Sequence, residues 1–312
     1  MNRQSVSAQS LAMVGLGRMG ANMSRRLARH GVTVHGFDGD STARAALEQE
    51  PGVVTHLSLA AALAALPSPR VVWLMLPAGE ATESALGQAI AHLAPGDLVV
   101  DGGNANYLDS QRHATQLAEH GIQFVDCGVS GGVHGLANGY CLMVGGQSES
   151  VALLELIIRA LAPESGAGWA HCGDIGAGHF AKMVHNGIEY GMMQALAEGF
   201  ALLDGRPDLI RDQAALAQAW RRGSVIRSWL LDLTADALRD PGALAEVAPF
   251  VADSGEGRWT VDEAIRQGTP VPVIAAALFA RFDSQGHADP ANRLLAMMRR
   301  GFGGHAVRQS DS

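Results

Sequence analysis

The sequence predicts an α/β doubly wound sheet over residues 1–175, followed by an all-α C-terminal domain over residues 176–312. Three observations lead to this prediction. Short apolar segments alternate with helical segments from residue 11 to about residue 172, which is the pattern of parallel strands joined by right-handed crossovers. A glycine-rich stretch follows at 173–178. Beyond it the strand-like β-branched segments stop, and segments rich in alanine and leucine begin.

The elements are expected in the following order. Short apolar runs predict strands at 11–15, 32–37, 71–76, 97–101, 122–126, 140–145 and 168–172. Helical segments between them are expected at 18–30, 42–49, 79–93, 107–120 and 148–162. The later strands are candidates for an antiparallel edge. In the second domain a long helix is expected from His179 to about Asp204, ended by Gly205 and Pro207, with further helices at 208–221, 225–238, 260–267, 271–283 and 288–299.

Composition excludes several classes of protein. The 312 residues, 47% hydrophobic and 17% charged, are typical of an ordinary globular protein with room for two cores. A formal charge of -8 argues against nucleic acid or an anionic membrane as the main partner, although a local arginine cluster still permits an anionic substrate. Three widely spaced cysteines and the lack of a signal peptide or a transmembrane run lead us to expect a cytoplasmic protein.

A glycine motif joins the first expected strand to the first expected helix, and it consists of Gly15, Leu16, Gly17, Arg18, Met19 and Gly20. Glycines in this pattern permit a tight turn and a close backbone approach, so that a pyrophosphate can bind at the N-terminus of the helix. The spacing alone is a weak indication, but the strand before it and the helix after it supply the required context. We therefore expect a Rossmann-type dinucleotide-binding domain.

The second expected strand ends in Asp38. A carboxylate at this place accepts a hydrogen bond from the 2′-hydroxyl of the adenine ribose and repels a 2′-phosphate. The next residues are Gly39 and Asp40, so no arginine immediately follows to hold a phosphate. The expected cofactor is therefore NAD, with NADP disfavoured.

Three further segments follow expected strands at the edge where open α/β sheets bind ligands. Leu76, Pro77 and Ala78 form the first, and Asp101–Asn104 forms the second; simple turn chemistry and ligand contact account equally well for the latter. In the third, backbone amides at Gly131 and Gly132 beside the hydroxyl of Ser130 can form a small concavity suited to a carboxylate. An ordinary loop has the same composition, so the third segment gains weight from its convergence with Asn104 on one edge.

Four polar residues of the long helix, Lys182, His185, Asn186 and Glu189, are spaced i, i+3, i+4 and i+7 and therefore share one face. An amine that accepts a proton and a carboxyl that donates one are suited to acid/base chemistry on a small polar molecule. A solvated face with a Lys/Glu pair is the competing interpretation. The preceding glycines Gly176 and Gly178, with the upstream nucleotide motif, favour the catalytic one.

Other sites receive little support from the residues alone. No His, Cys and carboxylate cluster has the spacing of metal ligands, and no G-x-S-x-G turn is present, so neither a metal site nor a Ser-His-Asp hydrolase is expected. The remaining candidates are Arg258, Arg281, Arg299 and His305, and base rates favour a surface position over a ligand contact for each. Arg281 lies in the apolar stretch 278–282, which makes a purely solvent-facing role less fitting.

Taken together, the motifs resemble the 6-phosphogluconate dehydrogenase family of the β-hydroxyacid dehydrogenase superfamily. The resemblance rests on four segments in order, Gly15–Gly20, Asp101–Asn104, Gly128–Gly132 and Gly176–Tyr190, and it covers nearly the whole chain. The last segment is the most specific, because related hydroxyacid dehydrogenases share its lysine and an asparagine but not the continuation His-Asn-Gly-Ile-Glu-Tyr. The chain is similar to the short bacterial, NAD-preferring type.

The resemblance implies oxidative decarboxylation of 6-phospho-D-gluconate to D-ribulose 5-phosphate, CO2 and NADH without a metal, as in the pentose phosphate pathway and gluconate utilization. It implies Lys182 as general base and Glu189 as general acid. The residues implied to hold the sugar-acid end are Asn104, Ser130, Gly131, Gly132, His185 and Asn186. Tyr190 and Arg281 are implied at the phosphate, and Arg299 and His305 at a C-terminal contact that reaches a neighbouring subunit. The active enzyme is therefore expected to be a homo-oligomer, a dimer or a tetramer.

Two departures from the long form of the family leave questions open. The chain lacks a second helical repeat, and the stretch 253–260 is compressed, so that Glu256 stands about where the long form has a phosphate-contacting threonine. Arg258 is a candidate to replace the missing phosphate contact.

Two other functions stay open. One is a dehydrogenase of an unphosphorylated acid such as 3-hydroxyisobutyrate, which needs neither Glu189 nor the C-terminal Arg/His pair. The other is a non-catalytic NAD-binding regulator.

Overall fold

The computed structural model describes residues 9–164, 166–303, 306 and 308. The chain divides into two compact units, Met1–Met183 and Val184–Ser312, and each is described by itself. The division falls inside one long helix, α9 (Ala177–Asp204). The assignment of two domains to residues 1–175 and 176–312 stays a prediction.

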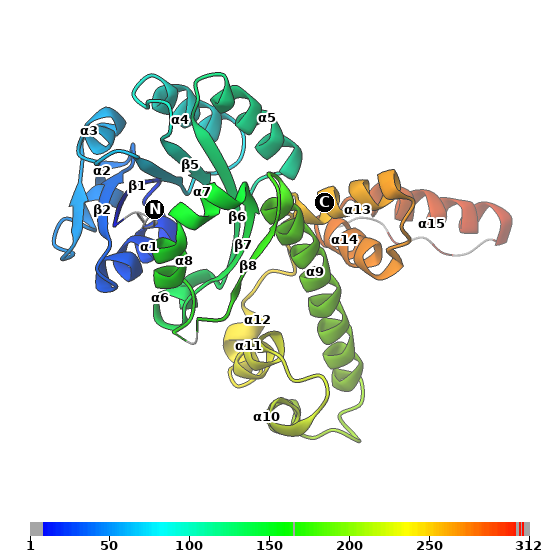
Figure 1. Ribbon diagram of the computed structural model, residues 1–312. Helices are drawn as coiled ribbons and strands as arrows, with labels where there is room; N and C mark the ends of the chain where they lie inside the picture. Colours follow the sequence, from blue (N-terminus) through cyan, green and yellow to red (C-terminus); the bar gives the residue numbers. More distant parts are fainter. Residues whose placement is uncertain (1–8, 165, 304–305, 307, 309–312) are drawn as a thin grey trace. The chain divides into compact units, whose positions relative to one another are not determined.

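The first unit is built on one sheet, which among the described residues has eight strands in the order β3-β2-β1-β4-β5-β6-β7-β8 (Figure 1). Neighbouring strands pair in parallel except β6 and β7, which are antiparallel. The predicted doubly wound sheet with an antiparallel edge is therefore confirmed. The strands are β1 (Ser10–Val14), β2 (Thr33–Phe37), β3 (Val53–Thr55), β4 (Val71–Leu74), β5 (Leu98–Asp101), β6 (Gln123–Ser130), β7 (Cys141–Gly146) and β8 (Trp169–Gly173).

Helices cover both faces of this sheet. Alternate residues of β1 enter two separate cores, since Leu11 and Met13 pack in one and Ala12 and Val14 in the other. Successive side chains of a strand point to opposite faces, so an uninterrupted apolar run is what a central strand between two helical layers requires. The helices are α1 (Arg18–Arg29), α2 (Ser41–Ala45), α3 (Leu59–Ala64), α4 (Glu80–Ile90), α5 (Tyr107–Ala118), the 3-10 turn η1 (Gly132–His134), α6 (Gly135–Asn138), α7 (Ser148–Leu153) and α8 (Glu155–Leu161).

The first unit differs from the expectation chiefly in three ways. The short elements β3, α3, η1 and α6 were not predicted, because three to six residues carry too little periodicity to stand out. The helix expected at 148–162 is interrupted at Leu154, whose backbone turns between α7 and α8. Strand β6 continues to Ser130 because it pairs there with β7, so Ser130 ends a strand and is not in a loop.

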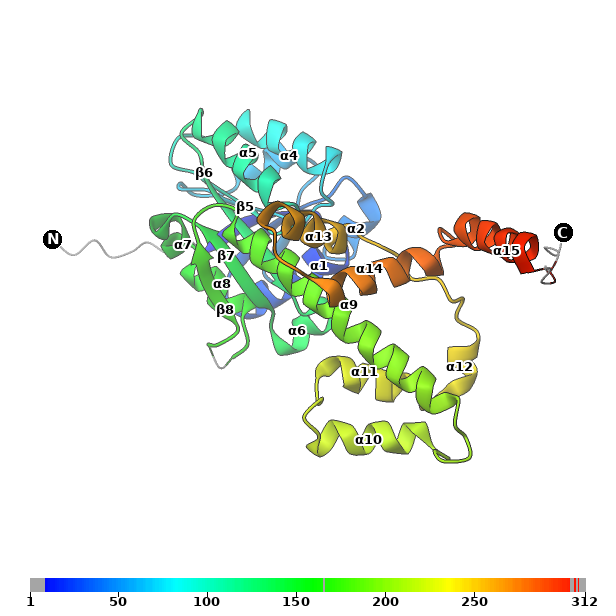
Figure 2. The same cartoon turned by 90° about the vertical axis from the view of Figure 1, so that its right-hand side faces the viewer.

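The described part of the second unit contains helices and no strands. The end of α9 packs with α10 (Gln213–Gly223) and α11 (Trp229–Ala237) through Phe200, Ala217 and Leu231, and Figure 2 shows α10 and α11 side by side. Tyr190 packs with Ala277 and Leu278 in a second small core. The remaining helices are α12 (Pro241–Ala245), which was not predicted, α13 (Glu256–Gln267), α14 (Pro272–Ser284) and α15 (Asp289–Gly303). Among the described residues, no helix is both long enough and apolar enough to span a bilayer.

Candidate active site

The glycine motif forms the turn between β1 and α1 as expected. Gly15 has a φ of +92°, which a residue with a side chain rarely adopts. A Cβ on Gly20 would overlap the carbonyl oxygen of Gly15, so the start of the helix lies directly on the turn. Within the described residues, no side chain caps the N-terminus of α1. Its first N–H groups therefore fit the pyrophosphate of a dinucleotide.

Asp38 follows β2 and is tied to the glycine turn. Its Oδ2 accepts the N–H of Leu16 at 2.7 Å, and its Oδ1 accepts the N–H of Asp40 at 2.8 Å. Arg44 of α2 donates from Nη1 to the carbonyl oxygens of Asp38 and Gly39, at 2.6 and 3.2 Å. No sequence pattern pointed to Arg44, because it stands on the next helix and is brought back to Asp38 only by the fold.

The other residues predicted at the sheet edge follow the carboxyl ends of β4, β5 and β6, which pair in parallel and therefore end on the same side. Leu76, Pro77 and Ala78 come after β4, and Asn104 is exposed after β5. Gly131 and Gly132 have φ values of +131° and +52°, so both lie in backbone conformations that favour glycine. The first unit thus gathers the predicted cofactor residues and part of the predicted substrate residues on one edge.

The first turn of α9 is bonded to β6 through a buried carboxylate. Asp126 accepts the N–H groups of Gly176 and His179 at 2.6 and 2.7 Å. The Nδ1 of His179 lies 2.6 Å from the Oγ of Ser110 on α5. Burial raises the pKa of the Asp126 carboxyl, while nearby His179 and the two N–H groups oppose the rise.

Lys182 lies on α9 against β6. A Cβ added to Gly128 would overlap the Cβ of Lys182, so the strand and the helix touch there without an intervening side chain. Lys182 is also the sole lysine of the chain: the 23 basic residues are this lysine and 22 arginines. Arginine stays protonated in proteins, whereas lysine can lose its proton and act as a base. This count is a sequence signal that the motifs themselves do not contain.

The remaining polar residues of the α9 face belong to the second unit. The Nδ1 of His185 is 3.1 Å from the Oδ1 of Asn186 and 3.8 Å from the Oε2 of Glu189. Asn186 is buried, while the side chains of His185 and Glu189 are 39% and 40% exposed. The basic side chain that lies near the Glu189 carboxylate here is therefore a histidine.

Tyr190 and Arg281, both predicted at the phosphate, meet in the second unit. The Arg281 guanidinium carbon lies 3.5 Å from the centre of the Tyr190 ring, and its Nη1 donates to the carbonyl of Ala252 at 2.7 Å. The Tyr190 hydroxyl is buried and has no hydrogen-bond partner in the described part of the chain. Glu256 is buried and accepts the hydroxyl of Ser254 at 2.7 Å.

Three further findings concern the predicted ligands. Arg258 is paired with Asp253 and lies 4.3 Å above the ring of Phe282. Arg299 is exposed on α15, and His305 lies outside the described residues. Over the described ranges, no group of three or more His, Cys, Asp or Glu residues is arranged to hold a metal ion.

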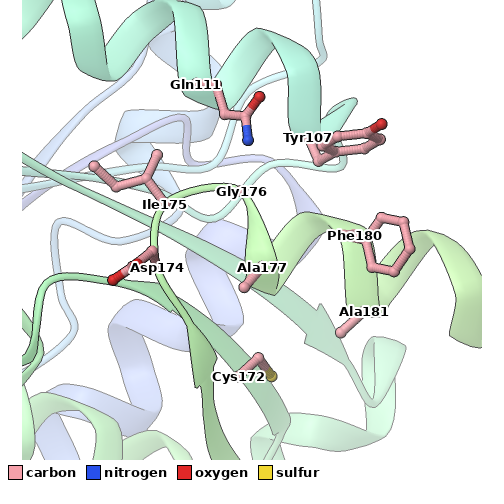
Figure 3. Close-up of a pocket in the computed structure, with 9 residues that line it drawn as sticks. All are labelled: Tyr107, Gln111, Cys172, Asp174, Ile175, Gly176, Ala177, Phe180 and Ala181. Carbon is pink, nitrogen blue, oxygen red and sulfur yellow. The ribbon is translucent and has the colours of Figure 1, made fainter.

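A pocket of ≈ 400 Å³ opens beside the first turn of α9, and its walls come from α5, the end of β8 and α9 (Figure 3). None of the predicted site residues lines it. The lining residues are Tyr107, Gln111, Cys172, Asp174, Ile175, Gly176, Ala177, Phe180 and Ala181.

Comparison with known proteins gives a consistent family. The profile described as the NAD binding domain of 6-phosphogluconate dehydrogenase matches residues 10–173, and the profile described as the C-terminal domain of 6-phosphogluconate dehydrogenase matches residues 178–309. A protein of Haloferax volcanii named "6-phosphogluconate dehydrogenase, NAD(+)-dependent, decarboxylating" is 41% identical over 303 residues, which are 96% of this chain and 99% of that protein.

Two solved structures have the same fold. Plasmodium falciparum 6-phosphogluconate dehydrogenase is 26% identical with a TM-score of 0.82, over 97% of this chain and 67% of that one. Mycobacterium tuberculosis 3-hydroxyisobutyrate dehydrogenase is 25% identical with a TM-score of 0.66, over 90% of this chain and 94% of that one. These matches, with a glycine turn fitted to a nicotinamide dinucleotide, identify the chain as a member of the 6-phosphogluconate dehydrogenase family.

Proposed function

We propose that this protein oxidises and decarboxylates 6-phospho-D-gluconate to D-ribulose 5-phosphate and CO2, with NAD as the preferred cofactor, Lys182 as general base and Glu189 as general acid. The observation that carries the proposal is the position of the sole lysine. Lys182 contacts β6 at Gly128, on the strand that ends in Ser130. The family membership supplies the reaction class.

The proposed roles follow from the chemistry of each group. The neutral amine of Lys182 takes the proton of the substrate C3 hydroxyl. The NAD held by the glycine turn and Asp38 would supply the acceptor for the hydride of C3. As CO2 departs from the resulting β-keto acid, the C3 carbonyl oxygen takes up the electron pair, and the protonated Lys182 stabilises the developing charge with a hydrogen bond. Glu189, protonated, then delivers a proton to the carbon that carried the carboxylate, which becomes C1 of ribulose 5-phosphate.

Substrate orientation is assigned to the other predicted residues. The proposed contacts of the sugar acid are Asn104, Ser130, Gly131, Gly132, His185 and Asn186. Tyr190 and Arg281 are proposed at the phosphate, because a buried hydroxyl without a partner among the described residues and an adjacent guanidinium both donate hydrogen bonds. Arg299 and His305 are proposed to act in a neighbouring subunit of a homo-oligomer.

The direct test is an assay of the purified protein with 6-phosphogluconate. We expect reduced cofactor to appear by absorbance together with stoichiometric CO2 and ribulose 5-phosphate, and we expect EDTA to leave the rate unchanged. Gluconate and 3-hydroxyisobutyrate serve as the unphosphorylated comparisons. Faster turnover of 3-hydroxyisobutyrate without CO2 release would overturn the proposal.

The alternative of an unphosphorylated substrate has one specific observation in its favour. The 3-hydroxyisobutyrate dehydrogenase named above is matched over 94% of its length, whereas the Plasmodium enzyme is matched over 67%. Against it stand the lower TM-score and the presence of Glu189, for which a reaction without decarboxylation has no use. The assay with the three acids separates the two functions.

The preference for NAD is tested at Asp38. The double variant Asp38→Ser/Gly39→Arg is expected to shift the ratio of kcat/KM for NADP over NAD upward at least about tenfold, because a repelling carboxylate is replaced by a cation. Serine keeps an oxygen that can accept the N–H of Leu16, so the glycine turn retains its tie to β2.

The single variant Gly39→Arg is the matched control for this experiment. It adds the cation but keeps the carboxylate, so we expect a smaller shift. An unchanged ratio in the double variant would show that Asp38 does not select the cofactor. In that case Arg44, which is bonded to the carbonyls of Asp38 and Gly39, becomes the residue to replace next.

A further inference from the structure

We infer that Asp126 is a positioning residue for Lys182: its carboxylate holds the first turn of α9 on β6, and the placement of the catalytic amine depends on that bond. The inference rests on the proposed function in one respect, the role of Lys182 as base. It adds a residue that takes no part in the chemistry and that no motif of the sequence marked.

The carboxylate that accepts the N–H groups at the start of α9 comes from a distant part of the chain. The first N–H groups of a helix need acceptors, and the side chain just before the helix commonly supplies one. In α9 the acceptor is Asp126, separated by 50 residues from Gly176 and by 53 from His179. Both carboxylate oxygens accept an N–H, which is the pattern of the ionised group. The bond therefore ties the helix to the sheet and does more than end a local turn.

The contact continues along the strand toward Lys182. Asp126, Gly128 and Ser130 are alternate residues of β6 and so share one face of the sheet. A Cβ on Gly178 would lie 2.6 Å from the carbonyl oxygen of Asp126, so the helix backbone rests on the strand backbone. At Gly128 the strand meets Lys182 itself. One face of β6 thus carries the anchor, the contact with the base and a proposed substrate ligand.

A second tether acts on the same turn. The side chain of His179 is bonded to Ser110 of α5, while its backbone N–H is bonded to Asp126. His179 precedes Lys182 by three residues, which places the two about one helical turn apart. The turn that carries the base is therefore held from both β6 and α5.

Asp126 is 0% exposed, and burying a carboxylate carries a large desolvation penalty unless its oxygens are bonded. A serine or threonine just before the helix would avoid that penalty but accept only one of the two N–H groups, and Gly176 at that position has a φ of +94°, which disfavours a side chain. A link to the strand beneath Lys182 is what the buried carboxylate adds. Catalytic groups need placement to about 0.5 Å, and such a link provides it.

The test compares Asp126→Asn and Asp126→Ala in the full chain. Asparagine keeps one acceptor, and its amide N–H faces the other helix N–H, so one bond is lost; alanine loses both. We expect kcat with 6-phosphogluconate to fall about tenfold in Asp126→Asn and about 100-fold in Asp126→Ala, the scale of a reacting group misplaced by about 1 Å. The dissociation constant of the dinucleotide, measured by fluorescence titration, should stay within about twofold because the glycine turn is untouched.

The second readout does not need turnover. Trinitrobenzenesulfonate reacts with amines, and Lys182 is the sole lysine, so mass spectrometry separates its modification from that of the terminal amine. We expect the Lys182 reaction to be severalfold faster in both Asp126 variants, since release of the first turn opens the amine to the reagent. If wild-type protein does not turn over 6-phosphogluconate, the proposed function fails, while this readout still decides the inference.

Asp97→Asn is the matched control. Asp97 is 1% exposed and also accepts two backbone N–H groups, those of Arg70 and Ala94, but it lies before β5 at the opposite end of the strands. We expect it to lose thermal stability with an unchanged kcat per folded molecule. The inference is overturned if a folded Asp126 variant keeps kcat within about twofold or leaves Lys182 reactivity unchanged. It is also overturned if Asp97→Asn lowers kcat equally. Should Asp126→Ala not fold, Asp126→Asn decides.

Discussion

Lys182→Met is expected to lower kcat about 100- to 10,000-fold, the usual effect of removing a general base. Methionine has a similar length and no proton to exchange, so it keeps the contact of the side-chain stem with Gly128 and removes only the amine. Binding of the dinucleotide should be unchanged, because the glycine turn and Asp38 lie elsewhere on the sheet edge. Steady-state kinetics and cofactor titration measure the two effects separately.

Lys182→Arg is the informative companion to this variant. It retains the positive charge but does not lose a proton in the accessible pH range. If the lysine serves only to attract the anionic substrate, the arginine variant should keep most of the activity. If it serves as the base, the arginine variant should be as inactive as the methionine one. Activity near that of the wild type in either variant would remove Lys182 from the mechanism.

Glu189→Gln is expected to lower steady-state kcat over the same range of about 100- to 10,000-fold. Glutamine has the same shape and still offers an oxygen to His185, which lies 3.8 Å from the carboxylate in the native chain, but it has no acidic proton to deliver to C1. Since hydride leaves before that proton arrives, the first hydride transfer should remain fast. Rapid mixing should therefore show a burst of reduced cofactor followed by a slow phase.

Glu198→Gln supplies the control for Glu189. Glu198 lies further along α9, is exposed, and accepts the side-chain amide of Gln194 at 2.8 Å. Its replacement removes the same charge from the same helix and should leave both the burst and the steady state unchanged. If Glu189→Gln slows the first hydride transfer as much as the steady state, so that no burst is seen, Glu189 acts before or during hydride transfer and is not the final acid.

The sheet and the helical second unit could be predicted from the sequence because the patterns that indicate them are local. The run Leu11–Val14 and the glycines at Gly15 and Gly20 identify a strand, a turn and a helix start within ten residues, and this supported the fold and the family. The common face of the four polar residues of α9 could be predicted for the same reason, since helical spacing alone assigns them to it. Their roles remain predictions until the variants are measured.

The features that could not be predicted from the sequence depend on contacts between segments that are distant along the chain. Ser130 was expected in a loop, because the antiparallel partner that extends β6, Cys141–Gly146, is not adjacent to it in sequence. Arg44 and Asp126 gave no signal, since a charged residue six or fifty positions from its partner matches no short motif. The sole lysine could have been found by counting, because it stands alone beside 22 arginines and, unlike arginine, lysine can lose its proton.

The continuity of α9 has a geometric consequence. Lys182 and Glu189 are seven residues apart on one uninterrupted helix of 28 residues, so they are separated by about 10 Å along the axis and differ by only about 20° in direction. The number of residues between the two groups therefore fixes both their separation and their relative direction. One residue inserted between the two groups would turn Glu189 by about 100°, away from the face of Lys182, without changing any side chain. A change in chain length between Lys182 and Glu189 is therefore expected to remove the common face that their proposed roles require.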